Sequence, residues 1–286
     1  MKIGISGAAG QLGQAVLKRV KELPGDHKVV GISRTPQSVQ NADEARRGDF
    51  DRPTTLQTAY TDLDRLLIIP SIDIRYGVRA RQLIAAIDAA LSSGVGRIVL
   101  ISDVGTRDEA EPAVGAASWV GEQHLIKSAP AWSVLRANYF MESYVEEVLL
   151  WSAVGRLAEL GDNRVGFVSR DDVATAAAGI LLGAGHLGAI YNATGPEALS
   201  VTDRAALMSD IVKKPIEVVQ TSVDGLGREL RGAGFPEAYL GIVSDAKRQS
   251  AKGGFDIVTG DVERLPGRPP QTLQWVPEDS CRRNAR

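Results

Sequence analysis

A glycine-rich stretch near the amino end of the chain constrains its fold more than any other feature. Residues 6–13 read Ser-Gly-Ala-Ala-Gly-Gln-Leu-Gly and follow the short apolar run of residues 3–5. Gly7, Gly10 and Gly13 therefore stand where a buried strand would turn into a helix. Glycines at these points let the backbone approach a phosphate closely and direct the N-terminus of the helix toward it.

The rest of the chain alternates between strand and helix signals. The run 66–70 is apolar without alternation, which is typical of a parallel strand covered on both faces. We expect strands at 2–6, 29–32, 47–50, 66–70, 97–102 and 132–136, helices at 11–22, 54–60, 78–92 and 117–128, and a short polar helix within 41–48. This order predicts an α/β fold with a doubly wound parallel sheet of the Rossmann type. In that context the turn is expected to bind a nucleotide through Gly7, Ala9, Gly10, Gln11, Leu12 and Gly13.

The pattern changes after residue 138. We expect a helix at 139–150, a short strand at 165–168, a helix at 171–182, a last strand of the main sheet at 190–193, a helix at 202–212 and a strand at 216–220. The sequence thus predicts a nucleotide-binding domain of residues 1–138 and 165–195. Residues 139–164 and 196–286 are expected to form a smaller C-terminal α+β lobe that binds the substrate.

Composition excludes several classes of protein. The 286 residues suffice for a large core, and a formal net charge of −2 with mixed signs argues against a nucleic-acid binder. The single cysteine, Cys281, and the lack of a Cys/His cluster argue against disulfides and a metal site. Without a leader signal or an apolar run of spanning length, we expect a cytoplasmic protein with no membrane association. The oligomeric state is left open, with a homodimer as one option.

The end of the second strand indicates which nucleotide binds. A site that prefers NAD usually carries an acidic residue about 20 residues beyond the glycines, where it accepts from the ribose 2′-OH. Here Ser33-Arg34-Thr35 stands at that point instead. A guanidinium beside the adenosine ribose favours a 2′-phosphate, so the sequence predicts NADP(H) over NAD(H). The alternative is a solvated loop arginine.

Other strand ends supply further candidates for the cofactor site. The carboxylate of Asp49 could meet the adenine amino group while the ring of Phe50 packs beside it. Alternatively, Phe50 belongs to the core and Asp49 to a turn. Pro70, Ser71 and Ser102 are expected to flank the ribose and the nicotinamide.

Two adjacent acids, Asp171 and Asp172, admit two interpretations. They could be catalytic carboxylates. However, Ser169 three residues before Asp172 at the start of a helix has the spacing of a capping box, which is the interpretation we favour.

Several segments resemble the NmrA-like branch of the short-chain dehydrogenase/reductase superfamily. Besides the glycine-rich stretch, they are Ser-Arg-Thr-Pro at 33–36, Leu-Leu-Ile-Ile-Pro-Ser at 66–71, Leu-Arg-Ala-Asn-Tyr-Phe-Met-Glu at 135–142, Ser-Arg-Asp-Asp-Val-Ala at 169–174, Tyr-Asn-Ala-Thr-Gly-Pro-Glu-Ala-Leu-Ser at 191–200 and Ser-Ala-Lys-Gly-Gly-Phe at 250–255. The likeness extends to about residue 276 and is greatest to the type 2 NAD(P)H:quinone oxidoreductases and triphenylmethane reductases. It implies a Rossmann fold, an NADP(H) cofactor and reductase activity.

One departure from the superfamily concerns the proton donor. Its ketone reductases use a Tyr-x-x-x-Lys pair, but no tyrosine lies between Tyr76 and Tyr139 here. In the helix where relatives carry the lysine, this chain has His124, which could donate near the nicotinamide or could serve the structure alone. Ser102 and Tyr139 are further candidate catalytic donors, although Tyr139 could equally form a pocket wall. Asn138 is expected at the cofactor.

The lack of the Tyr-x-x-x-Lys proton donor also constrains the class of substrate. Hydride transfer to a ketone leaves an alkoxide that demands a proton, whereas a quinone leaves a phenolate-like anion that is far better stabilised by itself. Hydrogen-bond donors alone can serve the second reaction. We therefore predict an NADPH-dependent oxidoreductase that transfers hydride to a quinone or similar conjugated aromatic, with no flavin implied. The alternatives are a non-catalytic NADP(H)-binding redox sensor, and an accessory reductase or isomerase of a biosynthetic pathway.

Overall fold

The computed structural model describes residues 1–110, 113–265 and 267–273, and it divides into two compact units. The first unit comprises Met1–Ala137, Arg170–Ala193 and Asp261–Gly267. The second comprises Asn138–Ser169, Thr194–Gly260 and, of the described residues after these, 268–273. Residues 138, 165–169 and 194–195, expected in the nucleotide-binding domain, thus lie in the second unit, and residues 261–267, expected in the lobe, lie in the first.

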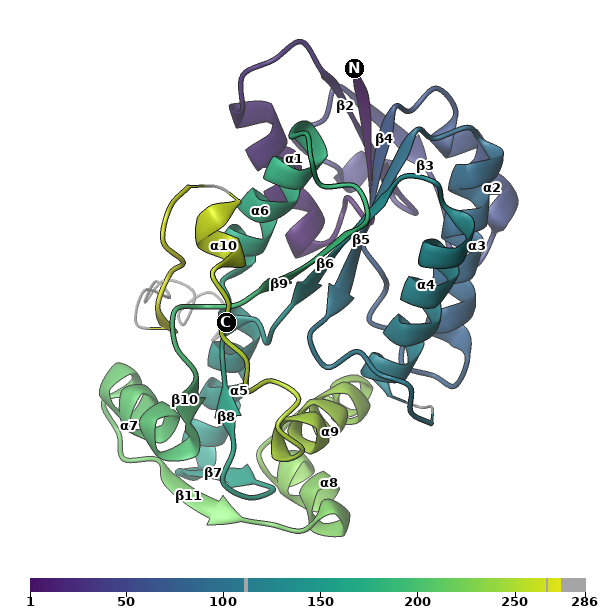
Figure 1. The fold of residues 1–286 in the computed structure, drawn as a ribbon. Coiled ribbons are helices and arrows are strands. Elements are labelled where there is room, and N and C mark those ends of the chain that lie inside the picture. Colours follow the sequence, from purple (N-terminus) through teal and green to yellow (C-terminus); the bar gives the residue numbers. More distant parts are fainter. Residues whose placement is uncertain (111–112, 266, 274–286) are drawn as a thin grey trace. The chain divides into compact units, whose positions relative to one another are not determined.

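A seven-stranded parallel sheet forms the centre of the first unit (Figure 1). Its strands follow the order β3-β2-β1-β4-β5-β6-β9, so the connections reverse direction between β1 and β4. The strands are β1 (Lys2–Ser6), β2 (Lys28–Ser33), β3 (Glu44–Arg47), β4 (Arg65–Ile68), β5 (Arg97–Asp103), β6 (Trp132–Ala137) and β9 (Ala189–Ala193). The predicted Rossmann-type α/β fold is confirmed. Because ligands of such sheets bind beyond the carboxyl ends of the strands near the reversal, this edge positions the candidate site.

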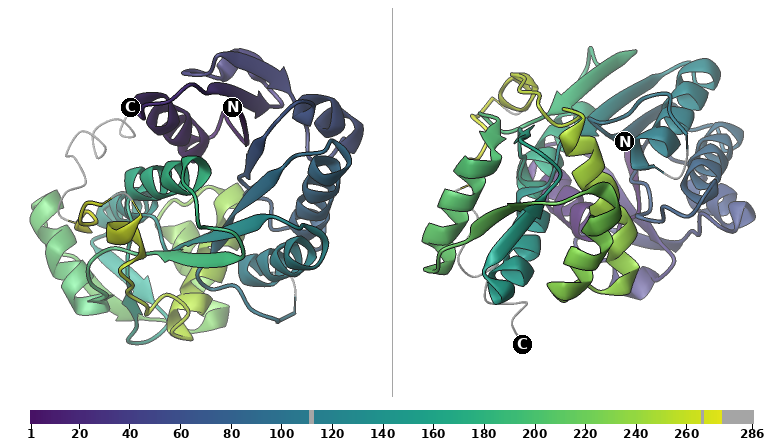
Figure 2. Two further views of the ribbon diagram at one scale, coloured as in Figure 1. Left: turned by 45° about the horizontal axis from the view of Figure 1, so that its top comes forward. Right: turned by 90° about the horizontal axis from the view of Figure 1, so that it is seen from below.

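Helices cover both faces of this sheet. Figures 1 and 2 show α1 and α6 on one face and α2, α3 and α4 on the other. Their bounds are α1 (Gln11–Glu22), α2 (Pro53–Tyr60), α3 (Val78–Ser92), α4 (Val114–Ser128) and α6 (Arg170–Leu182), with the short η1 (Pro36–Ser38) and α10 (Asp261–Arg264). Beneath α2, α3 and α4, a continuous core buries Ile32, Leu56, Leu83, Ile87 and Leu125. Fully burying each such side chain stabilises the fold by about 1.5–3 kcal/mol.

An ion pair joins α1 to α6. The Arg19 guanidinium contacts both carboxylate oxygens of Asp171, at 2.6 and 2.8 Å. Asp171 therefore has a structural partner at the start of α6. Asp172 is fully buried beside it.

The expected short helix within 41–48 is wrong, because this segment forms the edge strand β3. Two bonds bring the chain alongside β2. The backbone N–H of Asp43 donates to the carbonyl of Val29, and the Asp43 carboxylate accepts from the N–H of Val29, both at 2.8 Å. Pairing with β2 thus outweighs the polar composition of the segment.

The second unit combines helices with two small sheets. Its elements are α5 (Met141–Val154), β7 (Arg156–Glu159), β8 (Arg164–Val165), β10 (Leu199–Ser200), α7 (Val201–Val212), β11 (Glu217–Gln220), α8 (Val223–Gly232) and α9 (Glu237–Ala251). Strand β7 pairs in parallel with β11. The sequence did not indicate β7, because Arg-Leu-Ala-Glu contains no β-branched or aromatic residue. A core that includes Tyr144, Trp151 and Phe235 holds the unit together.

Among the described residues, none of the helices combines the length and the apolar character needed to cross a bilayer.

Candidate cofactor-binding site

The glycine-rich turn is fixed between two strands by backbone geometry. The N–H groups of Gly7 and Ala8 both donate to the carbonyl of Ile32 on β2, at 3.0 and 3.1 Å. Gly7 has a φ of +91°, and a Cβ on it would lie 2.9 Å from the carbonyl oxygen of Ile69. Only glycine fits this position, because the φ value and the close approach both disfavour a side chain.

The start of α1 packs directly on the turn. A Cβ on Gly13 would lie 2.4 Å from the carbonyl oxygen of Gly7 and 2.8 Å from the Cα of Ala8. Gly10 is the N-cap of α1 and is exposed, with no side-chain cap and no acidic residue in the first helical turn. The first N–H groups of α1 thus lack a side-chain acceptor, and the positive end of the helix dipole suits an anion there.

The three other predicted residues of the turn differ in exposure. Ala9 is half-buried, Gln11 is exposed and Leu12 is buried. The Leu12 side chain belongs to the core of the first unit. Leu12 could therefore contact a cofactor only through its backbone.

Arg34 directly follows β2 and is exposed. Nearby, the Oγ of Ser33 accepts from the N–H of Thr35 at 3.1 Å, which shapes the turn after the strand. Within the described part of the chain, the Arg34 guanidinium forms neither a hydrogen bond nor an ion pair. Its donors are free to bind an external anion.

Asp49 and Phe50 have structural contacts of their own. One carboxylate oxygen of Asp49 accepts from the N–H of Asp51 at 3.1 Å, and the N–H of Asp49 donates to the Oγ1 of Thr55 at 3.0 Å. Phe50 packs against the core beneath α2 and α3. These contacts favour the interpretation of a turn and a core residue, and leave the second oxygen of Asp49 for an adenine contact.

Ser71 and Pro70 follow β4, as the sequence suggests. The Ser71 hydroxyl donates to the Oε1 of Gln82 at 2.5 Å, and Gln82 donates onward to Asp51 at 2.9 Å. This chain of bonds ties the loop after β4 to the loop after β3.

Ser102 lies at the carboxyl end of β5 and is only 2% exposed. Its Oγ is 3.1 Å from the Oγ1 of Thr106. The two hydroxyls thus form a pair at the edge where the nicotinamide was expected.

A second polar cluster at this edge was not predicted. The Asp103 carboxylate accepts from the Arg79 guanidinium at 2.8 Å and from the Ser118 hydroxyl at 2.5 Å. Arg79 also donates to the carbonyl of Ser71. The cluster joins the ends of β4 and β5 to α3 and α4. Asp103 directly follows Ser102, but nothing in the sequence indicates that Arg79 and Ser118 converge on it.

His124 does not lie where the sequence suggested. Helix α4 follows β5 and returns toward the amino ends of the strands, and His124 lies in its second half. The Nε2 of His124 contacts the Oδ1 of Asp88 on α3 at 2.6 Å, at the surface. This position corresponds to the structural alternative, and the function proposed below gives His124 no role.

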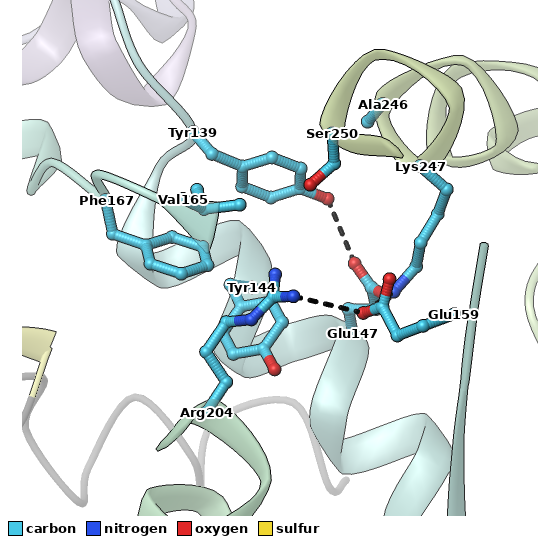
Figure 3. A pocket seen from close by; sticks show the side chains of 10 residues that line it. All are labelled: Tyr139, Tyr144, Glu147, Glu159, Val165, Phe167, Arg204, Ala246, Lys247 and Ser250. Carbon is cyan, nitrogen blue, oxygen red and sulfur yellow. Dashed lines mark hydrogen bonds and ion pairs between the residues drawn. The ribbon is translucent and has the colours of Figure 1, made fainter. Parts of the chain in front are cut away.

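Asn138 and Tyr139 belong to the second unit. The side-chain amide of Asn138 donates to the carbonyl of Phe255 at 3.1 Å. The phenol of Tyr139 donates to Glu147 at 2.9 Å (Figure 3). Burial, reinforced by the Glu147 carboxylate, raises the pKa of Tyr139 well above its ordinary value. A phenol held in this way is a poor proton donor for catalysis.

Tyr139 and Glu147 line a pocket of the second unit, and this pocket contains a buried network of charges (Figure 3). The ammonium of Lys247 contacts Glu147 at 2.5 Å and Glu159 at 2.8 Å. Arg204 donates to Asn163 at 2.7 Å. Burial opposes the charged forms, but the opposite charges outweigh it, so the pKa of Lys247 is raised and that of Glu159 is lowered. The network connects α5, β7, α7 and α9.

The carboxyl edge of the sheet therefore brings together the glycine-rich turn and Arg34, Asp49, Phe50, Pro70, Ser71 and Ser102. No group of three or more His, Cys, Asp or Glu residues within the described ranges is arranged to hold a metal ion.

The fold and the turn at this edge define a dinucleotide-binding protein of the Rossmann type. Residues 7–183 match a family model described as NAD(P)H-binding, and the chain belongs to that family. In line with the predicted resemblance, its relatives include an NmrA-like family domain-containing oxidoreductase of Aspergillus flavus, 22% identical over 94% of this chain and 92% of that protein.

Two bacterial relatives match almost end to end. Quinone oxidoreductase 2 of Escherichia coli is 26% identical over 95% of this chain and 96% of its own length. An NAD(P)H azoreductase of Xenophilus azovorans is 25% identical, with 94% of each chain covered. The relatives thus include NAD(P)H-dependent reductases.

Solved structures give the same result. The NADPH-dependent quinone oxidoreductase of Escherichia coli, complexed with NADPH, superposes with a TM-score of 0.86 at 26% identity, covering 98% of this chain and 99% of the other. The triphenylmethane reductase of Citrobacter sp., complexed with NADP(H), has a TM-score of 0.84 at 22% identity, with coverages of 96% and 98%, and shows that the fold is shared.

Proposed function

We propose that this protein is an NADPH-dependent reductase of quinones or similar conjugated aromatic compounds. The observation that carries the proposal is the carboxyl edge of the sheet. There, a turn suited to a phosphate and built from Gly7, Gly10 and Gly13 lies beside the end of β2. At that end stands Arg34, which has no ion pair among the described residues, instead of the acidic residue typical of NAD sites. The quinone oxidoreductase and azoreductase among the relatives support the same class of reaction.

The residues of this edge fit NADPH on chemical grounds. The turn and the open N-terminus of α1 suit the pyrophosphate, and Arg34 suits the 2′-phosphate through charge-assisted hydrogen bonds. When bound, the reduced nicotinamide supplies a hydride to the acceptor. The contribution of the chain is to hold the cofactor and to stabilise negative charge on the reduced acceptor.

Helix α4 argues for conjugated acceptors over simple ketones. It contains no tyrosine, and its one lysine, Lys127, lies in its last turn. The helix thus cannot provide a Tyr-x-x-x-Lys pair to protonate an alkoxide. A quinone needs less assistance, because its reduced anion delocalises the charge.

Ser102 is the donor we assign to this edge. Its hydroxyl lies at the end of β5, with Thr106 positioned to accept or donate a second hydrogen bond. A donor held in advance at a developing oxyanion stabilises the transition state without reorganisation. Tyr139 and Asn138 have partners within the second unit and receive no catalytic role.

The test is to supply the purified protein with NADPH or NADH and a panel of quinones, azo dyes and triphenylmethane dyes. We expect the absorbance of the reduced nicotinamide to fall with at least one conjugated acceptor, and faster with NADPH than with NADH. Oxidation with ketones alone would contradict the substrate class.

The cofactor preference has a separate test. Arg34→Ala should weaken NADPH binding by roughly 10- to 100-fold, because hydrogen bonds to a charged group are lost, and should leave NADH binding nearly unchanged. Equal losses for the two cofactors would show that Arg34 does not bind the 2′-phosphate.

The second candidate function is a redox sensor that binds NADP(H) without turnover. The specific observation in its favour is again the lack of a tyrosine in α4. Tight NADPH binding without oxidation by any acceptor in the panel would favour the sensor.

A further inference from the structure

We propose that Arg47 is a second anchor for the 2′-phosphate of NADP(H) and acts together with Arg34. This inference rests on the NADP(H) preference proposed above. It adds a specificity-determining residue from a different strand, which the sequence pattern did not single out.

Strand register places the two arginines at one edge. Ser33 on β2 pairs with Arg47 on β3, and both are the last residues of their strands. Arg34 is therefore the next residue after the register partner of Arg47. Neighbouring parallel strands lie about 4.8 Å apart, so two long guanidinium side chains from these positions can reach one phosphate.

The pleat of the sheet determines the face on which Arg47 lies. A Cβ on Gly31 would lie 3.4 Å from the Cβ of Ala8, so this face of β2 is the one beside the glycine-rich turn. Ser33 lies two residues further on the same face, and its partner Arg47 shares that face.

The preceding residue, Arg46, lies on the opposite face of the sheet. Arg46 donates to the carbonyls of Ala59 at 2.9 Å and Thr61 at 2.7 Å, at the end of α2. It also pairs with Glu44. Arg46 thus points away from the turn and is fully engaged, whereas Arg47 lies on the side of the turn.

Arg47 is exposed and, like Arg34, has no hydrogen bond or ion pair with any residue in the described ranges. The two acidic residues that precede it, one just before β3 and one at its start, are already engaged in ion pairs. Asp43 pairs with Lys21 at 2.6 Å, and Glu44 pairs with Lys2 as well as with Arg46. Two uncompensated cations therefore remain at this point of the edge.

A phosphate monoester is the ligand that this arrangement fits. It carries close to two negative charges and three acceptor oxygens, enough for two guanidinium forks at once. An unphosphorylated ribose offers no charge to hold them. Arg47 should therefore contribute to the discrimination between NADP(H) and NAD(H).

The experiment uses two small probes, 2′,5′-ADP and 5′-AMP, which differ by the 2′-phosphate and contain no nicotinamide. Calorimetry gives the dissociation constants of both for the wild type, Arg47→Ala, Arg47→Lys and Lys28→Ala. Lys28 is the matched control, because it is an exposed cation at the opposite end of β2 without a side-chain partner in the described chain.

We expect Arg47→Ala to raise the dissociation constant of 2′,5′-ADP by roughly 10- to 100-fold and to change that of 5′-AMP by less than about threefold. The affinity of Arg47→Lys for 2′,5′-ADP should lie between those of the wild type and Arg47→Ala, because lysine keeps the charge but loses the forked geometry of the guanidinium. Lys28→Ala should resemble the wild type.

Three results would overturn the inference. If the wild type prefers 2′,5′-ADP and Arg47→Ala keeps that preference, Arg47 is not an anchor, while the proposed cofactor stands. If the wild type shows no preference for 2′,5′-ADP, the inference fails together with the NADP(H) assignment. Equal weakening of both probes would show that Arg47 contacts the adenosine and would also refute the inference.

Discussion

At the scale of single residues, the glycines of the turn are the best determined part of the site. Gly7 has a φ of +91°, and a Cβ on it would meet the carbonyl oxygen of Ile69 at 2.9 Å. Gly13 has an ordinary φ, but its hydrogen faces the carbonyl of Gly7 at close range. The spacing of the three glycines in the sequence predicted a tight turn between a strand and a helix, because such a turn leaves little room for side chains.

The first prediction concerns Gly7. Gly7→Ala should lower the free energy of unfolding by about 1–3 kcal/mol and weaken NADPH binding, because the turn must move away from Ile69. Thermal unfolding and calorimetric titration measure the two effects. Gly232→Ala is the control, since nothing lies within 4 Å of a Cβ there. It should be neutral or slightly stabilising.

The second prediction concerns Ser102. Ser102→Ala should lower kcat by up to about 100-fold with a quinone acceptor and leave the Kd for NADPH unchanged, because the hydrogen bond to the reduced acceptor is lost while the glycine-rich turn and Arg34 stay in place. Stopped-flow and binding measurements separate the two quantities. An unchanged kcat would remove Ser102 from the mechanism.

Sequence patterns did not predict the positions of side chains that depend on individual contacts made only in the folded chain. His124 shares a helix with a plausible catalytic position, yet Asp88, 36 residues earlier, provides its contact. Tyr139 follows a strand that ends at the site, but Glu147 accepts from its phenol within the second unit. Neither partner has a signal in the sequence.

At the scale of elements, the apolar strands of the main sheet were predictable, whereas the polar strands β3 and β7 were not. Apolar runs such as residues 66–70 identify central strands. Strand β3 consists of Glu-Ala-Arg-Arg and is a strand only because β2 offers it an edge. The same holds for β7, which depends on its pairing with β11.

The charge network of the second unit leads to the third prediction. Lys247→Met should lower the free energy of unfolding by about 3–5 kcal/mol, because Glu147 and Glu159 remain buried without their cation. Chemical denaturation measures this loss. Arg248→Met, on the same helix but partly exposed, should change stability by less than about 1 kcal/mol.

The fourth prediction is a pH dependence of the same network. Because the pKa of Glu159 in the folded protein lies below its ordinary value of 4.5, the stability it contributes is present above that value. It is lost as the pH falls through the lowered pKa. Glu159→Gln should therefore be less stable than the wild type at neutral pH, and the difference should shrink below pH 4.5. A constant difference at all pH values would show that the carboxylate is not held ionised.

At the scale of the whole molecule, the first unit has the architecture of an NAD(P)H-binding protein, and the family match spans residues 7–183. The second unit has its own core and its own polar centre. The chemistry we propose rests on the carboxyl edge of the first unit, where the turn, Arg34 and Ser102 lie at the ends of β1, β2 and β5.

The most direct test of the proposed function is a single turnover. The protein is first saturated with NADPH, or with NADPH carrying deuterium at the transferred position, and is then mixed with a quinone in a stopped-flow instrument. We predict that the nicotinamide absorbance decays in one turnover and decays more slowly with the deuterated cofactor, because hydride transfer occurs on the protein. Tight binding of NADPH with no decay in the presence of any conjugated acceptor would contradict the reductase and leave an NADP(H) sensor.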